Sequence, residues 1–330
     1  MAKHANISVF VPHIGCPGRC SFCDQTKIAC IAEKPDAKSV DEAVALAQTS
    51  KNYSPENTEI AFFGGSFTAI EREYMLELLS SASKYAEDRI VAGIRISTRP
   101  DAIDEEILDI LKKYHVTAIE LGAQSMDDSV LEINRRGHNA KSIEEASALI
   151  KKSGFSLGLQ MMTGLLGDTP HKALETARKI AALRPDTVRI YPTIVLKGTM
   201  LAEEYEAGNY APQSLEEATR LAADILEIFN EADINVIRLG LHEIDTASYV
   251  AGPWHPAFSE LVQSYLFLKK MEQEIKASGD YIVCCSPKDL SKVLGQKRSN
   301  VGALAQKGIN IQVRSQEGIG AGEIKIIKEK

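Results

Sequence analysis

The chain contains few cysteines and no long apolar run. Its six cysteines in 330 residues are too few for a small disulfide-stapled secreted protein, and this density is usual in a reducing compartment. The first residues lead into a strand-like segment without the apolar stretch of a signal peptide. No apolar segment is long enough to cross a bilayer. We therefore expect a cytoplasmic protein with no membrane-spanning part.

Basic charge is also in short supply. The 38 Lys and Arg residues are outnumbered by 45 Asp and Glu residues, which gives a formal net charge of −7. A protein that binds nucleic acid over a broad face normally carries a basic surface. The composition therefore argues against such a face, but it leaves room for a local basic groove. The sequence shows no internal repeat and no low-complexity tract, and its 44% apolar residues are enough for a sizeable core.

Three of the cysteines lie close together. Cys16, Cys20 and Cys23 have the spacing C-x3-C-x2-C. Three thiolates on one short loop can hold three irons of a [4Fe-4S] cluster, which usually takes four cysteines, and the fourth iron is then open to another ligand. The aromatic residue just before the third cysteine would supply apolar cover for the cluster. A zinc site completed by Cys30 or His13 is the alternative, although structural zinc ligands usually form two short pairs.

The first 240 residues alternate between strand-like and helix-like segments. Apolar runs bounded by turn residues predict strands at 7–12, 59–63, 93–98, 118–121, 157–161, 188–194 and 235–240. Amphipathic segments predict helices at 40–48, 71–86, 104–114, 142–153, 170–183 and 214–231. This alternation is typical of a parallel sheet with helical crossovers. The fold class that we expect is α/β, a partial (βα)6 TIM-like barrel over residues 1–240 with a small α/β appendage over residues 241–330.

In barrels of this kind the functional site lies at the carboxyl ends of the strands. Polar or glycine-rich motifs follow five of the predicted strands: the cysteines, Gly64-Gly65-Ser66, Ser97-Thr98-Arg99, Gln124-Ser125 and Thr163-Gly164. Each motif alone could be a helix cap, but five at one rim predict a site. Gly64-Gly65 permits positive φ and a close approach of the backbone to a ligand. A tight turn before the helix at 71–86 is the alternative for this pair.

Together, the cysteine loop and the Gly64-Gly65-Ser66-Phe67-Thr68 loop resemble the radical S-adenosylmethionine (radical SAM) superfamily. Within it, the chain is similar to the radical SAM core of the catalytic subunit of Elongator. The similarity is carried by residues 12–25, 63–68, 97–101, 121–125, 135–139, 160–164, 188–197 and 251–262, which span about three quarters of the chain. Residues 251–258 narrow it to the Elongator-like branch and the C-terminal region of that branch. The 330 residues hold no acetyltransferase domain like that of the Elongator subunit, so we expect a different reaction.

The resemblance implies a set of cofactor-binding residues. Cys16, Cys20 and Cys23 would bind a [4Fe-4S] cluster, and the loop of Gly64, Gly65 and Ser66 would meet the methionyl amino group of S-adenosylmethionine (SAM). The positions that contact ribose and carboxylate in radical SAM cores, including oxygen-independent coproporphyrinogen oxidases, are matched by Ser97, Gln124, Arg136 and Gln160. Arg135 is the alternative to its neighbour Arg136. Because Ser97 and Gln160 replace acids of the coproporphyrinogen oxidases, the resemblance argues against haem-precursor chemistry.

The implied activity is reductive cleavage of SAM to a 5′-deoxyadenosyl radical, which abstracts a hydrogen atom from the substrate. A low-potential electron donor such as ferredoxin or flavodoxin is the implied partner. The resemblance implies no catalytic residue, and it leaves both tRNA and a small molecule open as the substrate. Two other classes also stay open. They are a non-catalytic iron–sulfur protein for sensing or electron transfer, and a zinc-stabilised RNA-binding module.

The C-terminal third carries weaker signals. We expect a long helix at 258–278, strands at 281–285 and 309–313, and a charged tail at 325–330 that frays. His242 and His255 are candidates for contact with the substrate, although a histidine beside a turn is more often a packing or capping residue.

Two further features of this region have an ordinary explanation. We expect Cys284 and Cys285, in an apolar context, to be buried thiols. A polar and basic stretch is formed by Lys292, Lys297, Arg298 and Asn300. We expect it to be solvated surface, with contact to phosphate as the alternative.

Overall fold

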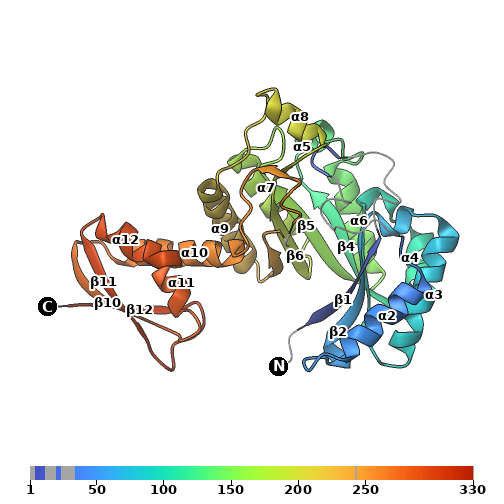
Figure 1. Cartoon of the computed structure of the whole chain (residues 1–330), viewed down its shortest axis with the longest axis horizontal. Coiled ribbons are helices and arrows are strands. Elements are labelled where there is room, and N and C mark those ends of the chain that lie inside the picture. Colours follow the sequence, from blue (N-terminus) through green and yellow to red (C-terminus); the bar gives the residue numbers. More distant parts are fainter. Residues whose placement is uncertain (1–3, 12–19, 24–33, 242–243, 330) are drawn as a thin grey trace.

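The computed structural model describes residues 4–11, 20–23, 34–241 and 244–329. Seven strands form one curved sheet in the order β1-β2-β3-β4-β5-β6-β8 (Figure 1). They are β1 (Ala5–Val11), β2 (Thr58–Gly64), β3 (Gly93–Thr98), β4 (Val116–Gln124), β5 (Ser156–Thr163), β6 (Thr187–Pro192) and β8 (Asn235–Leu239). Every neighbouring pair is parallel. Because β1 and β8 stand at opposite ends of this order, the sheet is an open, partial barrel, and the predicted fold class is confirmed.

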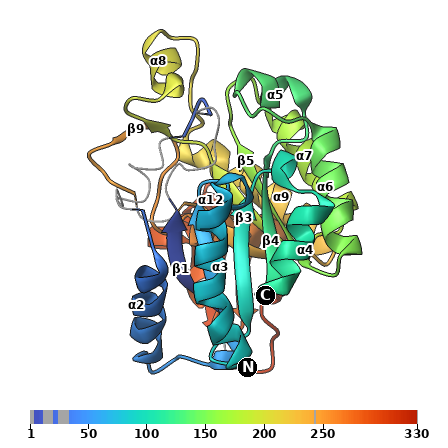
Figure 2. The ribbon, with the colours of Figure 1, turned by 90° about the vertical axis from the view of Figure 1, so that its right-hand side faces the viewer.

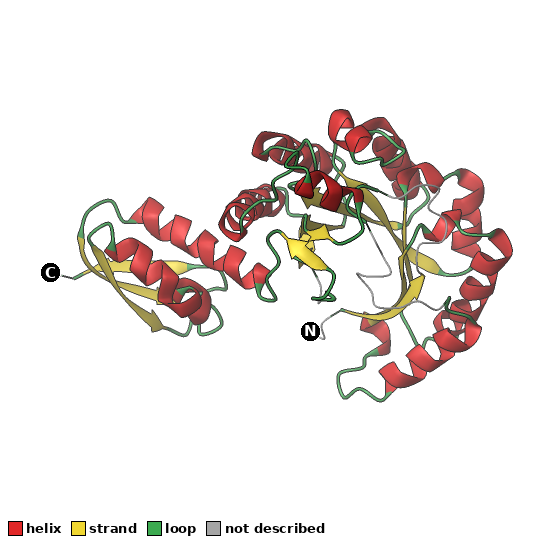
Figure 3. Ribbon diagram, turned by 45° about the horizontal axis from the view of Figure 1, so that its top comes forward, coloured by secondary structure: helices red, strands yellow, loops and turns green. Residues whose placement is uncertain are grey.

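Helices between the strands cover the outer side of the sheet. They are α2 (Ala37–Gln48), α3 (Arg72–Glu87), α4 (Glu105–Lys113), α6 (Ala140–Lys152), α7 (Pro170–Ala182) and α9 (Leu215–Glu231). Figure 2 shows α2, α3, α4 and α6 side by side, and Figure 3 shows the helices along the convex side of the curved sheet. None of the helices in the described part of the chain is both long and apolar enough to cross a membrane.

Helix α4 illustrates why these segments fold as they do. Asp104 precedes the helix, and its carboxylate accepts a hydrogen bond from the backbone N of Ile107 at 2.8 Å, which satisfies one of the free donors of the first turn. Ile107, Leu108 and Leu111 are buried on the side that faces the sheet. Lys112 and Lys113 follow in the last turn, where positive charge is favourable.

The concave side of the sheet carries a network of buried charges that the sequence did not predict. Arg95 donates from Nε to Glu59 at 2.8 Å and from Nη1 to Glu120 at 3.2 Å, and Arg189 donates from Nε to Glu120 at 2.7 Å. Residues such as Ile94 and Ile119, which alternate with these charges along the strands, belong to the apolar core beneath the helices. Since successive side chains of a strand point to opposite faces, the charges lie inside the partial barrel.

Smaller elements complete the barrel rim. They are α5 (Asp128–Ile133), α8 (Met200–Glu206) and an antiparallel pair, β7 (Val195–Leu196) and β9 (Tyr249–Ala251). The short helices were not predicted, because six or seven residues are too few to show a clear helical period.

A second, smaller sheet lies in the C-terminal part. Helix α10 (Phe258–Glu274) is followed by β10 (Gly279–Cys285), α11 (Leu290–Leu294), α12 (Ser299–Ala305), β11 (Ile309–Ser315) and β12 (Ile324–Lys328). The sheet order is β11-β10-β12, with β11 parallel and β12 antiparallel to β10. The prediction of a fraying tail from residue 325 was wrong. Ile324 and Ile326 of β12 pack against the core of this module, and the strand therefore stays paired.

Candidate active site

The predicted site residues meet at the carboxyl ends of the strands. Gly64 is the last residue of β2, Gln124 is the last residue of β4, and Ser97 is next to last in β3. Gln160 lies in β5, and Arg136 follows the short helix α5. Cys16 and the alternative zinc ligands, Cys30 and His13, lie outside the described residues.

The described part of the cysteine loop is short but well connected. Cys20 and Cys23 are both half-buried, and neither forms a disulfide with another described residue. The backbone N of Cys23 donates to Cys20 O at 3.1 Å, so a tight turn brings the two residues close together. This is an arrangement in which two thiolates could share one metal centre.

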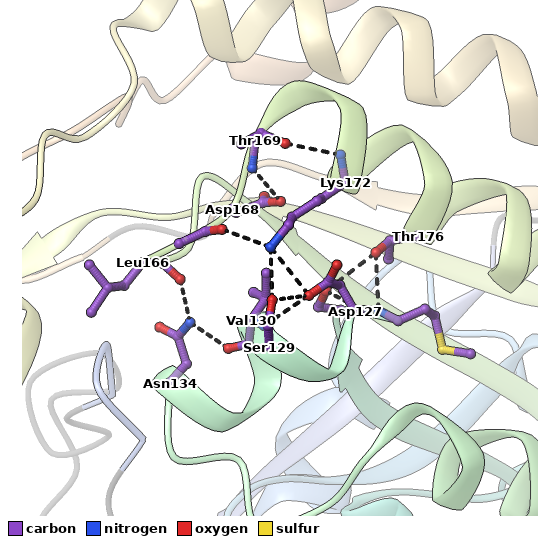
Figure 4. Close-up of polar contacts among 12 residues, drawn as sticks. Asp127, Ser129, Val130, Asn134, Leu166, Asp168, Thr169, Lys172 and Thr176 are labelled. Atoms are coloured by element: carbon purple, nitrogen blue, oxygen red, sulfur yellow. Dashed lines mark hydrogen bonds and ion pairs between the residues drawn. The ribbon is translucent and has the colours of Figure 1, made fainter.

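Asn134, which sequence reasoning missed, ties the cysteine loop to the barrel. Its Oδ1 accepts from Ser21 Oγ at 2.5 Å, and its Nδ2 donates to Val130 O at 2.8 Å and to Leu166 O at 2.9 Å. Figure 4 shows Asn134 between Val130 and Leu166, beside the polar cluster of Asp127 and Lys172. The same amide thus holds the loop, α5 and the turn after β5 in one arrangement.

Phe22 has apolar neighbours on two sides. It packs against one cluster that contains Leu166 and Leu201, and against another that contains Val130 and Met162. The ring is therefore held in an apolar environment, whereas its role as cover for a cluster stays a prediction.

Arg136 joins the cysteine loop to the sheet. Its Nη1 lies 3.1 Å from Cys20 Sγ, and its Nη2 donates to Gly122 O at 2.5 Å. Arg135 is exposed and has a left-handed backbone conformation with φ of 55°. Of the two neighbouring arginines, Arg136 is thus the one at the candidate site.

The glycine loop approaches the end of β1 closely. Gly64 has a φ of +113°, and a Cβ atom at this position would lie 2.5 Å from Val11 O. The backbone N of Gly65 donates to the same oxygen at 2.7 Å. Because Val11 is the last residue of β1 before the cysteine loop, the glycine pair positions the start of that loop.

The two predicted serines differ in their surroundings. Ser66 is buried, its Oγ accepts from Arg99 N at 3.0 Å, and it lies 3.0 Å from Thr98 Oγ1. Ser66 therefore links the glycine loop to the end of β3. Ser97 is half-buried, and its hydroxyl makes no hydrogen bond to another described residue.

Gln124 and Gln160 form a pair across β4 and β5. Gln160 Nε2 lies 3.4 Å from Gln124 Oε1. Gln124 has a φ of +67°, and the register between the two strands shifts between Gly122 and Gln124. A non-glycine residue in the left-handed region is strained and often belongs to a functional site. The irregularity turns the Gln124 amide toward its neighbour strand.

His138 is a second residue that sequence reasoning missed. Its side chain is fully buried, at 0% exposure, and its Nδ1 lies 4.0 Å from the carboxylate of Asp101. Burial, helped by the positive charge of Arg136, lowers the pKa of His138 to about 4. The imidazole is therefore neutral at pH 7, so it adds no positive charge behind Arg136.

Several buried polar atoms at this rim have no partner among the described residues. They include Nε of Arg136, Oγ1 of Thr163 and Oγ1 of Thr193. Thr163 ends β5, Thr193 directly follows β6, and Thr193 N donates to Thr163 O at 2.9 Å. Buried polar groups nearly always have hydrogen-bond partners. The rim thus offers donors and acceptors that suit a polar ligand such as SAM.

The remaining predicted residues lie in the C-terminal third of the chain. His255 Nδ1 accepts from Ala257 N at 3.1 Å, a local contact in the turn before α10. His242 lies outside the described residues. Cys284 and Cys285 are buried thiols in β10, as predicted.

Known protein families match two regions of the chain. The model described as the Radical SAM superfamily matches residues 10–180, more than half of the chain, and that of the Radical_SAM C-terminal domain matches residues 185–267. The solved structure of the archaeal Elp3 of Methanocaldococcus infernus has a TM-score of 0.66 at 23% identity, covering 83% of this chain and 64% of that chain. The fold is therefore shared with that protein.

Curated relatives give the same family. An uncharacterized protein of Methanocaldococcus jannaschii is 30% identical over 255 residues, 73% of this chain and 77% of that protein. The tRNA uridine(34) acetyltransferase of Dehalococcoides mccartyi is 26% identical over 253 residues, 66% of this chain and 55% of that enzyme. The chain thus spans about half the length of this relative of named activity. On the family match and the fold, the chain belongs to the radical SAM superfamily, whose members are enzymes.

Proposed function

We propose that this protein binds a [4Fe-4S] cluster through Cys16, Cys20 and Cys23 and uses it to cleave SAM. The observation that carries the proposal is the position of Arg136, which contacts both Cys20 and the strand end at Gly122. A guanidinium has five N–H donors in a rigid fork. Its buried Nε has no partner among the described residues, so this donor would be available to the SAM carboxylate.

The other residues of the rim would orient SAM. The backbone at Gly64 and Gly65 would approach the methionyl group, because no side chain separates it from a ligand. Ser97, Gln124 and Gln160 would offer hydroxyl and amide groups to the ribose and adenine. Their positions on neighbouring strands support this arrangement.

The cluster would be held by Cys16, Cys20 and Cys23, and SAM by the residues at the strand ends; when both are bound, they would supply the one-electron chemistry that removes a hydrogen atom from the substrate. The chain itself would hold the reactants in place and exclude water. Phe22 and its apolar neighbours would exclude water beside the cysteine loop.

We propose RNA, and tRNA in particular, as the substrate. The support is the similarity to a protein named tRNA uridine(34) acetyltransferase. Because the chain covers 55% of that enzyme, acetyl transfer is not part of the proposal. Ferredoxin or flavodoxin would supply the electron.

We further propose a division of the chain into two parts. Residues 1–240 would be the radical SAM core, and residues 241–330 would be a separate C-terminal region. We also propose that this enzyme works in the cytoplasm, where the cluster thiolates stay reduced.

Anaerobic reconstitution with iron and sulfide tests the cofactor proposal. The reconstituted protein should convert SAM to 5′-deoxyadenosine in the presence of dithionite, and Cys20→Ala should not. A cluster without SAM cleavage would favour a non-catalytic iron–sulfur protein, and bound zinc without iron would favour a zinc-stabilised module. Adding total tRNA tests the substrate, because a modified nucleoside should appear that depends on SAM.

A further inference from the structure

The small C-terminal sheet together with α11 and α12, residues 279–328, is called the C-terminal module here. It lies beyond both family matches, since the second of them ends at residue 267. Helix α10 packs on α9 of the barrel and extends to the small sheet (Figure 1). The module has its own apolar core, to which Val283, Val293, Leu304 and Ile311 belong. It is therefore built as a unit in its own right, and the proposed SAM chemistry does not use it.

The centre of this module is a strand–helix–loop–helix–strand unit. Strand β10 leads through α11, the loop Gly295-Gln296-Lys297-Arg298 and α12 into β11. Strands β10 and β11 are parallel and paired in register from Gly279 with Ile309 to Cys285 with Ser315. KH modules are small RNA-binding domains. They clamp the backbone of about four nucleotides with a four-residue loop that lies between two helices and opens with glycine. In this chain the fourth residue of the loop is Arg298, where KH modules have glycine.

The loop has the backbone that such a clamp requires. Gly295 has a φ of +75°, and a Cβ atom there would lie 2.4 Å from Ser299 Oγ and 2.8 Å from Asn300 N. Lys297 and Arg298 also have positive φ values, of 52° and 62°. The fourth position thus keeps a glycine-like conformation although its residue is arginine.

Asn300 holds the loop in this shape. It is 3% exposed, and its Nδ2 lies 2.8 Å from Ser264 O, 3.1 Å from Lys292 O and 3.2 Å from Val293 O. The expectation that Asn300 belongs to a solvated surface was wrong. Its amide fastens the end of α11 and the start of α12 to α10, so the loop between them is presented from a rigid base.

The charge of this unit is opposite to that of the whole chain. Residues 279–315 contain six Lys and Arg residues and two acidic residues, in a chain of net charge −7. Lys292 is paired with Asp289, and Lys307 with Glu272. The side chains of Lys297 and Arg298 are exposed and have no ion pair or hydrogen bond within the described ranges. Two neighbouring free cations on a rigid loop suit the phosphates of a nucleic acid.

The outer edge of the small sheet is also open. Strand β11 is the outer strand of the order β11-β10-β12, and Asn310, Gln312 and Arg314 are exposed along it. Asn310 Nδ2 donates to Asp280 Oδ1 at 2.8 Å, and Arg314 Nη2 donates to Gln312 Oε1 at 2.5 Å. The other N–H groups of these side chains can donate hydrogen bonds to phosphates, riboses and base edges.

We infer that the unit of residues 279–315 binds single-stranded RNA, with Lys297 and Arg298 on consecutive phosphates. The choice of RNA over DNA rests on the proposed function. The assignment of the binding surface rests only on the structure of the C-terminal module. The module would anchor the RNA apart from the cysteine loop, so RNA binding and SAM cleavage are separable properties of the chain.

Fluorescence anisotropy with a short, unstructured, labelled RNA tests this inference on the full reconstituted chain. Lys297→Glu with Arg298→Glu should weaken binding by about tenfold or more at low salt and reduce the slope of log K against log salt by about 1.4, since each phosphate contact on a single strand contributes about 0.7. The matched control is Lys112→Glu with Lys113→Glu, an exposed adjacent pair at the end of α4. It makes the same change in net charge and should bind as the wild type does.

A third variant guards against misfolding. Arg298→Gly removes one charge but suits the φ of 62°, so it should unfold at the same temperature or higher while still binding RNA more weakly. Equal affinities for the two double variants, or no binding of RNA by the wild type, would overturn the inference. Equal or tighter binding of single-stranded DNA of the same sequence would overturn the assignment to RNA. SAM cleavage should be the same in all variants, and its failure alone would count against the proposed function and not against this module.

Discussion

The guanidinium of Arg136 lies 3.1 Å from the sulfur of Cys20, although the two residues are separated by 116 positions. The same side chain also binds the carbonyl oxygen of Gly122 at the end of β4. One planar group therefore connects the cysteine loop with the rim of the sheet. Lysine could not make both contacts, because it has a single donor centre on a flexible stem.

Arg136→Lys should consequently weaken SAM binding by about tenfold or more, which corresponds to the loss of one charge-assisted hydrogen bond of about 1.5–3 kcal/mol. Equilibrium dialysis of the reconstituted protein measures the affinity. Arg135→Lys is the matched control, since Arg135 is exposed, and it should bind SAM normally. The reverse pattern would assign the contact to Arg135.

The cysteine variants separate cluster ligands from structural thiols. Cys16→Ala, Cys20→Ala and Cys23→Ala should each lose the cluster, because the thiolate is the strong ligand for iron. Cys284→Ala and Cys285→Ala should keep it, since these thiols are buried in the C-terminal sheet. Iron content and the visible absorption of the reconstituted proteins give the answer. Wild-type iron in any of the first three would remove that residue from the ligand set.

Gly64→Ala tests the close approach of the glycine loop to β1. The added Cβ would lie 2.5 Å from Val11 O, and the φ of +113° is unfavourable for alanine, so we expect a loss of about 3 kcal/mol in the free energy of unfolding together with lower iron content. Gly154→Ala is the control. Gly154 also has a positive φ, of +85°, but no heavy atom lies within 4 Å of the added Cβ, and this variant should lose only about 1 kcal/mol. Equal effects would mean that the contact with Val11 is unimportant.

Arg95→Met tests the buried charges. Glu59 and Glu120 would lose their shared partner, and removing one member of a buried ion network costs about 3–5 kcal/mol. Lys141→Met, which removes an exposed pair with Glu145, should cost less than about 1 kcal/mol. Chemical denaturation at pH 7 measures both values.

The same variant has an expected pH dependence. Burial by itself would raise the pKa of Glu59, but Arg95 and hydrogen bonds from Thr117 and His4 hold that pKa below its ordinary value of 4.5. A carboxylate with a lowered folded-state pKa contributes stability above its unfolded pKa, and this contribution is lost as the pH falls through the folded value. The wild type should therefore lose stability below pH 4.5, and the difference from Arg95→Met should shrink there, because protonated carboxyl groups no longer need Arg95. A difference that stays constant down to pH 3 would show that packing, and not charge, dominates.

The order of strands and helices, the cysteine spacing and the glycine pair were evident from the sequence by itself. Each is a local pattern, since burial of one face of a helix or strand imposes a period on nearby residues, and metal chemistry imposes a short spacing on cysteines. The same hydrophobic periods predict the strands, and the polar motifs lie directly after these strands. The parallel sheet then places those motifs at one rim.

Only the tertiary structure decided which side chains meet across that rim. Asn134 binds Ser21 across 113 positions, and Arg95 joins carboxylates from two neighbouring strands. No local period encodes such pairs, because they depend on the curvature of the sheet and on the register between strands, including the irregularity at Gln124. The pairing of β12 with β10 and the burial of Asn300 were hidden for the same reason. A charged segment has the same composition whether it frays into solvent, pairs at a sheet edge or stands free on a rigid loop, and only the packing of the distant residues around it distinguishes these outcomes.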